Sequence, residues 1–485
     1  MGKIYILLPM IGYLIAMFAV ALFCSRIKTN KDGEGFVQEY FIGGRTMGGF
    51  VLAMTLIATY ASASSFIGGP GVAYKLGFGW VLLAMIQVPT AFLTLGVLGK
   101  KFAIISRKIN AVTITGFLKA RYKSNTVVIL SSVAILVFFA ATMVAQFIGG
   151  ARLFQSVTGY SYRTGLIIFG LSVVIYTTIG GFRAVAITDA IQGVVMMIAT
   201  VFLFYSVVKF GGGMENIVSK IQEVSPQMLT PDAGGAISKP FILSFWILVG
   251  FAVLGLPQTS IRCMGFKDSK SLHNAMIIGT IVVGFLMLGM HIVGVFGSVV
   301  VPGIEVGDMA IPEITLKVMN PVLAGIFIAG PLAAIMSTVD SMLILASATI
   351  IKDLYINLFG GKEDGKIVSK MSFIITGVVG TIVFLLSLNP QSSLVWVNLF
   401  AFGGLEAAFL WPTILGLYWK RANAVGALCS MIFGVGAYVI FTLNSVKPLG
   451  MHQIVPTIVV SLVAFIIGSY MSKKPDKEVM DMFFY

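Results

Sequence analysis

The chain has 485 residues, of which 58% are hydrophobic and 11% are charged, and its formal net charge is +14. A soluble domain carries roughly twice that share of charged residues, so the composition excludes water as the main solvent of this chain. The basic residues stand between long apolar stretches and do not gather on one face, which argues against nucleic-acid binding.

Apolar stretches of about 20 residues, each long enough to cross ~30 Å of hydrocarbon, follow one another along the whole chain. They predict an all-α integral membrane protein with one transmembrane domain. The first stretch has no small-residue cleavage pattern after it and is expected to be a retained helix. We predict thirteen spans, over residues 4–24, 45–73, 78–101, 125–156, 161–180, 186–209, 240–264, 272–300, 319–350, 368–388, 392–418, 423–443 and 452–472.

The positive charges predict the orientation of these spans. With thirteen spans, most of the Lys and Arg residues fall in the odd-numbered loops, with the densest group between Lys100 and Lys123. By the positive-inside rule these loops are cytoplasmic. The N-terminus is therefore expected outside and the C-terminus in the cytoplasm.

Two of the predicted spans contain residues that interrupt helices. Met54–Lys75 holds three serines, a Gly-Gly pair and a proline, and Ser244–Cys263 holds two glycines and a proline at mid-depth. Irregular backbone survives inside a bilayer only around a cavity or an ion, and a spaced pair of broken helices is typical of inverted-repeat transporters. The alternative is that Gly and Pro only kink packed helices.

The segment Ala333–Leu343 concentrates polar groups within an apolar span. Ala334, Ser337 and Thr338 share one helix face, with Ser341 one turn further and Asp340 beside it. Two hydroxyls and a carbonyl, joined by carbonyls freed at Ala58 and Ala61, provide the oxygen ligands that a small hard cation prefers. The alternative is that the hydroxyls only bond back to carbonyls of their own helix.

Carboxylates within apolar spans are costly unless a cation pairs with them, which makes Asp189, Asp340 and Glu406 candidate functional residues. Asp189 has a structural alternative, an ion pair with Arg183. His291 is expected to be a hydrogen-bonded core residue. No nucleophile with a base partner and no metal-ligand spacing is present, so we do not expect an enzyme.

Several strings of residues together resemble the sodium/solute symporter family over nearly the whole chain. They are EYFIGGR (39–45), SASSFIGGPG (62–71), GWVLLAMIQ (79–87), QFIGGARL (146–153), GGFRA (180–184), AAIMST (333–338), SATIIKDLY (347–355) and AFGGLEAAFLWP (401–412). The resemblance implies a LeuT-type core of two inverted five-helix repeats, 45–209 and 240–418. One helix, 4–24, precedes the core, and two helices, within 423–472, follow it.

The resemblance also implies functional residues. A sodium site is implied at Ala58, Ala61, Ala334, Ser337 and Thr338, and a possible second sodium site at Asp189, Asp340 and Ser341. Asp340 stands where other members carry a serine, which leaves the sodium stoichiometry open.

Pantothenate is the solute that the resemblance implies. As an anion with an amide and two hydroxyls, it calls for hydrogen-bond donors between apolar walls. Arg152 and Arg262 could attract its carboxylate, but both are expected near the membrane faces, in gating or topological roles. The candidate solute residues are Tyr60, Ser64, Ser65, Phe66, Gln87, Gln146, Trp246, Gln258 and Glu406.

These expectations together describe a sodium-coupled symporter that works by alternating access in a bacterial inner membrane. Sodium is the coupling ion, and neither a cofactor nor an obligate protein partner is expected. Two alternatives are a sodium symporter for another small carboxylate or an amino acid, and a membrane sensor or channel.

Overall fold

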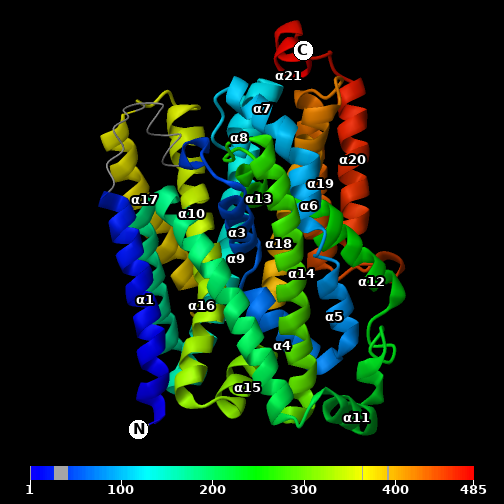
Figure 1. The fold of residues 1–485 in the computed structure, drawn as a ribbon. Helices are drawn as coiled ribbons and strands as arrows, with labels where there is room; N and C mark the ends of the chain where they lie inside the picture. Colours follow the sequence, from blue (N-terminus) through cyan, green and yellow to red (C-terminus); the bar gives the residue numbers. More distant parts are fainter. Residues whose placement is uncertain (1, 27–41, 363, 390–392) are drawn as a thin grey trace.

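A computed structural model of the chain describes residues 2–26, 42–362, 364–389 and 393–485. Within the helices, the side chains of residues 2, 3, 21, 24–26, 176, 179–184 and 366 are outside the description. The described part is built from helices and contains no β-strand, only an isolated bridge between Met47 and Phe266 (Figure 1). The all-α fold class expected from the composition is confirmed.

The helical elements follow the chain in this order. They are α1 (Gly2–Arg26), η1 (Gly43–Arg45), α3 (Gly49–Tyr60), η2 (Ser64–Gly68), α4 (Gly69–Leu76), α5 (Phe78–Met85), α6 (Thr90–Leu93), η3 (Thr94–Gly99), α7 (Lys100–Lys108), α8 (Ile114–Tyr122), α9 (Asn125–Thr158), α10 (Tyr162–Phe210), α11 (Met214–Val224), η4 (Pro226–Leu229), α12 (Lys239–Phe245), η5 (Trp246–Phe251), η6 (Ala252–Gly255), α13 (Pro257–Arg262), α14 (Ser269–Val300), η7 (Gly307–Met309), α15 (Ala310–Val318), α16 (Pro321–Ala348), η8 (Thr349–Ile356), α17 (Gly365–Leu386), α18 (Leu394–Tyr418), α19 (Ala424–Leu443), η9 (Pro448–Gly450), α20 (Ile454–Tyr470) and α21 (Lys477–Phe484).

Eight described helices are long and apolar enough to cross a membrane, and a ninth crossing results if the bent pair Gly49–Tyr60 and Ser64–Leu76 is one span. Shorter apolar helices lie at the remaining expected positions, at Ile4–Val20, Tyr162–Ile175, Lys239–Gly255 and Ile454–Tyr470. The expected spans 161–180 and 186–209 both fall within α10, which is assigned as helix throughout its 49 residues. The total of thirteen crossings remains a prediction.

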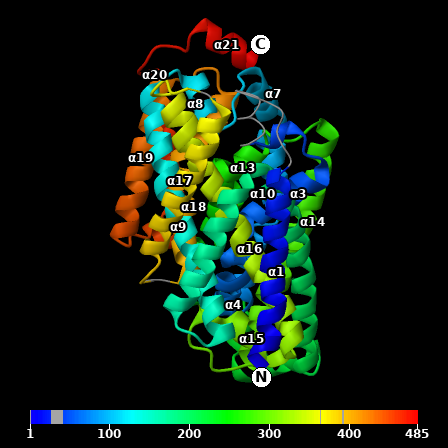
Figure 2. The same cartoon turned by 90° about the vertical axis from the view of Figure 1, so that its left-hand side faces the viewer.

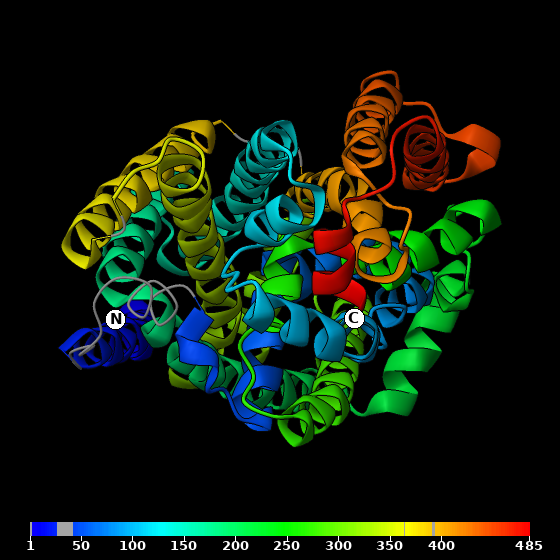
Figure 3. The same ribbon diagram turned by 90° about the horizontal axis from the view of Figure 1, so that it is seen from above.

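The long helices stand roughly side by side, with α16 in the interior and α1 at one edge (Figures 1 and 2). Every described residue of α16 from Gly330 to Ala348 is buried. Seen from above, α19 and α20 form a pair at the periphery, away from the N-terminal helix (Figure 3). The polar groups of α16 are therefore shielded on all sides by other helices.

The chain ends lie at opposite ends of the molecule (Figures 1 and 2). The basic helices α7 and α8 lie at the same end as α21 and the C-terminus, whereas α11 and α15 lie at the end of the N-terminus. An odd number of crossings requires this arrangement. It also places the densest basic segment at one end of the molecule, as the positive-inside reading expects.

The first expected break is observed between α3 and α4, whose axes are bent by 70°. Helix α3 ends at Tyr60, and Ala61 has an extended backbone (φ −70°, ψ 120°). The side chain of Gln146 on α9 stabilises this break, because its Oε1 accepts a hydrogen bond from the Ala63 N–H at 2.8 Å. The π-helical turn η2 then leads into α4, where Pro70 occupies the first turn and needs no N–H partner.

The second expected break is also observed. A π-helical turn, η5, and a 3₁₀ turn, η6, precede Leu256, whose backbone is extended (φ −79°, ψ 116°). Helix α13 then starts with Pro257 in its first turn. As in the first break, the proline begins a new helix on the far side of an extended residue.

Glycines let the segment after the first break pack closely against its neighbours. A Cβ at Gly294 of α14 would lie 2.1 Å from the carbonyl oxygen of Pro70, and a Cβ at Gly71 would lie 2.1 Å from that of Gly307. Main chain therefore contacts main chain on both sides of α4, and no other residue type fits there without a shift of the backbone.

Candidate ion and solute site

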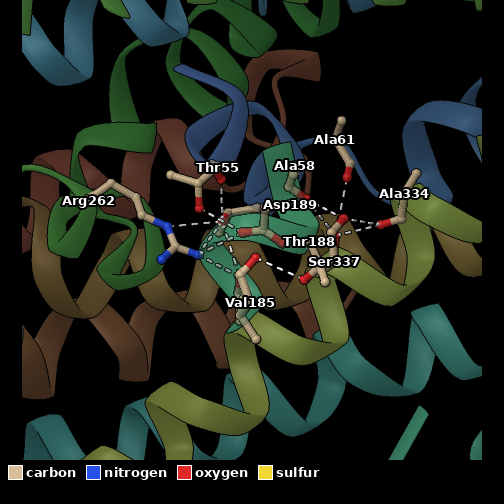
Figure 4. Close-up of polar contacts among 12 residues, drawn as sticks. Thr55, Ala58, Ala61, Val185, Thr188, Asp189, Arg262, Ala334 and Ser337 are labelled. Atoms are coloured by element: carbon tan, nitrogen blue, oxygen red, sulfur yellow. Dashed lines mark hydrogen bonds and ion pairs between the residues drawn. The ribbon is translucent and has the colours of Figure 1, made fainter. Parts of the chain in front are cut away.

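The oxygen atoms predicted to bind sodium meet where α3 ends against the middle of α16 (Figure 4). Ser337 Oγ lies 2.8 Å from the Ala58 carbonyl oxygen and 3.1 Å from that of Ala334. Thr338 Oγ1 lies 3.2 Å from the Ala61 oxygen, 3.0 Å from the Ala334 oxygen and 3.5 Å from the Ala58 oxygen. The structure thus brings together all five residues proposed from the sequence.

This cluster contains more close oxygen pairs than hydrogen atoms to place between them. Each hydroxyl has one hydrogen to donate, yet Ser337 faces two carbonyl oxygens and Thr338 faces three. The back-bonding alternative accounts for the contacts with Ala334, but not for those with Ala58 and Ala61. The oxygen pairs without a hydrogen between them repel each other. A cation among the five oxygens would stabilise these pairs.

One turn away on the same helices lies a second polar cluster, which surrounds Arg262 (Figure 4). Arg262 Nη2 donates to Ser341 Oγ at 2.6 Å and to Thr59 Oγ1 at 2.7 Å, and it lies 3.4 Å from Asp189 Oδ2. The Thr55 hydroxyl donates to the same Asp189 oxygen at 2.7 Å. All these side chains are buried, with Arg262 at 1% exposure and Asp189 at 0%.

Arg262 is buried among three helices and is not an exposed loop residue. It is the last residue of α13, and the extended residue before that short helix lets the chain turn inward. Arg262 is the described ion-pair partner of Asp189, whereas the alternative partner, Arg183, has a side chain outside the described residues.

Asp340 does not share this cluster's described hydrogen bonds. Its Oδ1 accepts a hydrogen bond from the Thr177 hydroxyl on α10. Of the three residues expected to form a second cation site, the structure thus joins Asp189 and Ser341 through Arg262 and gives Asp340 a different partner.

A small cavity of about 40 Å³ lies beside the first break. Four of the predicted solute residues, Tyr60, Ser64, Ser65 and Gln87, are among those that line it. Tyr60 Oη and Ser64 Oγ have no hydrogen-bond partner among the described residues, and neither does Asn398 Oδ1 of α18, which also lines the cavity. These three polar atoms are available to a bound molecule.

The other five predicted solute residues lie elsewhere. Phe66 is fully buried outside the cavity lining, and Gln146 supports the break through Ala63. Trp246 faces outward with 53% exposure and does not line the cavity. Gln258 and Glu406 are buried away from the lining, and their side-chain polar atoms have no partner among the described residues.

Three of the cavity-wall residues that sequence reasoning missed carry a polar group that a solute could contact. They are Trp80 of α5, His291 of α14 and Asn398 of α18. His291 does make the expected core hydrogen bond, through Nδ1 to the Met287 oxygen at 2.7 Å, but its Nε2 faces the cavity side, where a Cβ at Gly69 would lie 2.4 Å away. The close approach of His291 to Gly69 is the feature that identifies it as a wall residue. The sequence does not show this contact, because it depends on how the two helices pack.

Two interrupted membrane helices, with freed carbonyls that face the hydroxyls of a third, buried helix, define the class of ion-coupled secondary transporters. Residues 40–434 match the family described as the sodium:solute symporter family, and the chain belongs to that family.

Similar proteins agree with this membership. The chain is 51% identical to the sodium/pantothenate symporter of Haemophilus influenzae, over 97% of this chain and 97% of that protein. It is 50% identical to the sodium/pantothenate symporter of Escherichia coli, over 96% of each. Among solved structures, a Na⁺-coupled sialic acid symporter superposes with a TM-score of 0.78 at 19% identity, covering 98% of this chain and 99% of that chain, which shows that the fold is shared.

Proposed function

We propose that the chain imports pantothenate together with sodium across a bacterial inner membrane. The substrate named for the two relatives at 51% and 50% identity supports the choice of solute. The observation that carries the sodium site is the five-oxygen cluster, in which Ser337 and Thr338 face more acceptor oxygens than they have hydrogens.

The cavity beside the break is the place proposed for the solute. Its aromatic walls include Trp80 and Phe402, and Tyr60, Ser64 and Asn398 present polar atoms for the amide and hydroxyls of pantothenate. No described Lys or Arg side chain lines the cavity. A sodium ion at Ala58 and Ala61, on the segment that also carries Tyr60 and Ser64, would therefore place a positive charge next to the cavity.

This arrangement gives a physical basis for coupling. Sodium would hold the broken end of α3 against α16, and the same segment forms one wall of the cavity. Binding of the ion then favours the conformation with higher affinity for the anion, and the anion favours the ion-bound conformation by the same free energy. The inward sodium gradient drives the cycle.

Alternating access requires the cavity to change size. At about 40 Å³ it is far below the ~300 Å³ of the smallest common ligand pockets, so the solute enters only when the surrounding helices separate. We propose that one group of helices rocks against the other around the two breaks. In this proposal the N-terminus is outside and the C-terminus is in the cytoplasm.

Uptake of labelled pantothenate into vesicles that contain the purified chain tests this function. We expect uptake to stop when external Na⁺ is replaced by choline, because choline is too large for the oxygen cluster. Uptake that continues unchanged in choline would disprove sodium coupling.

A panel of unlabelled competitors in the same assay tests the solute. We expect pantothenate to compete and other small carboxylates and amino acids to leave uptake unchanged. Stronger competition by one of those compounds would assign the chain to the alternative, a sodium symporter for another solute.

A further inference from the structure

The cluster around Arg262 has the composition of a second cation site. Asp189 provides a carboxylate, and Thr59 and Ser341 provide hydroxyl oxygens, from three different helices. Thr59 follows Ala58 directly, and Ser341 lies one turn beyond Ser337, so this cluster adjoins the proposed sodium site on both helices. A monovalent cation at this position would neutralise the buried Asp189 carboxylate.

The guanidinium of Arg262 already meets those three oxygens. Nη2 is directed at Ser341, Thr59 and Asp189, and Nε lies 3.2 Å from Thr59 Oγ1. A sodium ion would need the same oxygen lone pairs that these N–H groups use. Because an arginine keeps its charge at all physiological pH values, the position holds one permanent positive charge.

The backbone explains how a side chain reaches a site between three helices. Arg262 stands at the end of α13, directly after the second break, and the extended residue Leu256 sets the direction of that helix. The two breaks thus place different groups in the interior. The first exposes carbonyl oxygens that have no helical partner, and the second is followed by a cationic side chain.

We propose that the Arg262 guanidinium is a tethered substitute for a second coupling cation, so that one sodium ion accompanies each solute. This inference rests on the proposed sodium-coupled function. The one sodium ion still binds at the five-oxygen cluster. This stoichiometry has a consequence for charge. One Na⁺ and one monovalent carboxylate carry no net charge, so the membrane potential adds nothing to the driving force.

The test is the solute accumulation at which net flux stops, measured in vesicles that contain the full chain. At zero membrane potential, a ten-fold inward sodium gradient supports about ten-fold accumulation of pantothenate with one sodium ion and about 100-fold with two. An inside-negative potential of 100 mV leaves the ratio unchanged with one sodium ion and raises it about 50-fold with two. We expect the one-sodium results, and the two-sodium results overturn the proposal.

Variants test whether Arg262 is the reason that one sodium ion accompanies each solute. Arg262→Gln removes the tethered charge and leaves the Asp189 carboxylate to bind sodium, so accumulation should follow the square of the sodium gradient. Arg262→Gln combined with Asp189→Asn removes both charges and should restore the first-power dependence. A first-power dependence in Arg262→Gln alone overturns the role of Arg262.

Two controls complete the set. Arg121 is equally buried but donates to the main-chain oxygens of Gly416 and Trp419, so Arg121→Gln should keep the first-power dependence. Arg262→Lys retains a tethered cation and should also keep the first-power dependence on the sodium gradient. This variant tests the proposal if Arg262→Gln fails to fold. A second-power dependence in Arg262→Lys overturns the proposal, whereas sodium-independent uptake would instead refute the proposed function.

Discussion

At the scale of single residues, the two hydroxyls of Ser337 and Thr338 are the side chains that connect α16 to the broken end of α3. Each contacts a carbonyl oxygen across the interface as well as one in its own helix. As interhelical hydrogen bonds, the contacts across the interface contribute only about 0.5–1.5 kcal/mol each to stability. These residues should therefore affect sodium dependence more than stability.

We predict that Ser337→Ala combined with Thr338→Ala raises the sodium concentration for half-maximal uptake by at least about ten-fold. The reason is that a hydrogen-bonding or ion-dipole contact to a charged group contributes about 1.5–3 kcal/mol, and two such contacts are lost. The measurement is initial uptake over a sodium titration.

Ser347→Ala is the matched control. Ser347 lies on the same helix and is fully buried, but its hydroxyl contacts Ser372 at 2.9 Å, away from the break. Its sodium titration should match that of the unaltered chain. An unchanged titration in the double variant would rule out the five-oxygen site.

The sequence correctly predicted which residues lie together where several polar groups occur at helical spacing, as at Ala334, Ser337 and Thr338. It did not place His291 and Asn398 at the cavity, because neither has another polar residue one turn away on its helix. A lone residue has no spacing pattern to interpret. Its role depends on which helix faces it, and that is set by packing.

At the scale of elements, prolines and glycines made both breaks predictable. They did not predict the direction in which the side chains next to each break point. The π-helical turn η5 adds a residue to the helical repeat, and Trp246, at its start, faces outward with 53% exposure. The burial of Arg262 among three helices was missed for a related reason. The extended Leu256 redirects α13, and hydropathy contains no information about that direction.

Close packing of α4 against α14 leads to a second prediction, that Gly294→Ala lowers thermal stability and uptake. The added Cβ would meet the Pro70 carbonyl oxygen at 2.1 Å, and that oxygen belongs to the main chain and cannot rotate away. Overpacking of this kind costs about 1–3 kcal/mol. The midpoint of thermal unfolding in detergent measures it.

Gly284→Ala on the same helix controls for the change of residue type. Its Cβ would meet only Val88 at 3.5 Å, an ordinary contact, and alanine favours a helix by about 0.5–1 kcal/mol over glycine. This variant should be at least as stable as the original chain. Equal stability of the two variants would contradict the tight contact at Gly294.

At the scale of the whole molecule, the separation of the termini and the location of the basic helices agree with an odd number of crossings. Apolar length predicted the positions of the eight described long apolar helices and of the bent pair, because that length follows directly from the thickness of the bilayer. It does not predict which helices lie inside. The almost complete burial of α16 depends on its neighbours, and its apolar residues resemble those of peripheral helices.

Orientation leads to a third prediction, tested with single cysteines in a chain whose Cys24, Cys263 and Cys429 have been replaced. A cysteine at Gln222, an exposed residue of α11, should react with a membrane-impermeant maleimide in intact cells, because α11 lies at the end of the molecule that holds the N-terminus. A cysteine at Lys474, an exposed residue in the connection from α20 to α21, should react only after the membrane is opened, because α21 lies at the opposite end. The reverse pattern would invert the topology.

The hydrogen bonds that Ser337 and Thr338 donate within the five-oxygen cluster would also set how tightly the proposed sodium ion is held. Before a sodium ion can use the two hydroxyl oxygens, their hydrogens must turn away from Ala58, Ala61 and Ala334. Each hydrogen bond given up costs about 1 kcal/mol. This cost weakens sodium binding and hastens release. A carrier that must unload its ion into the cell in every cycle benefits from a site that closes on itself when the ion leaves.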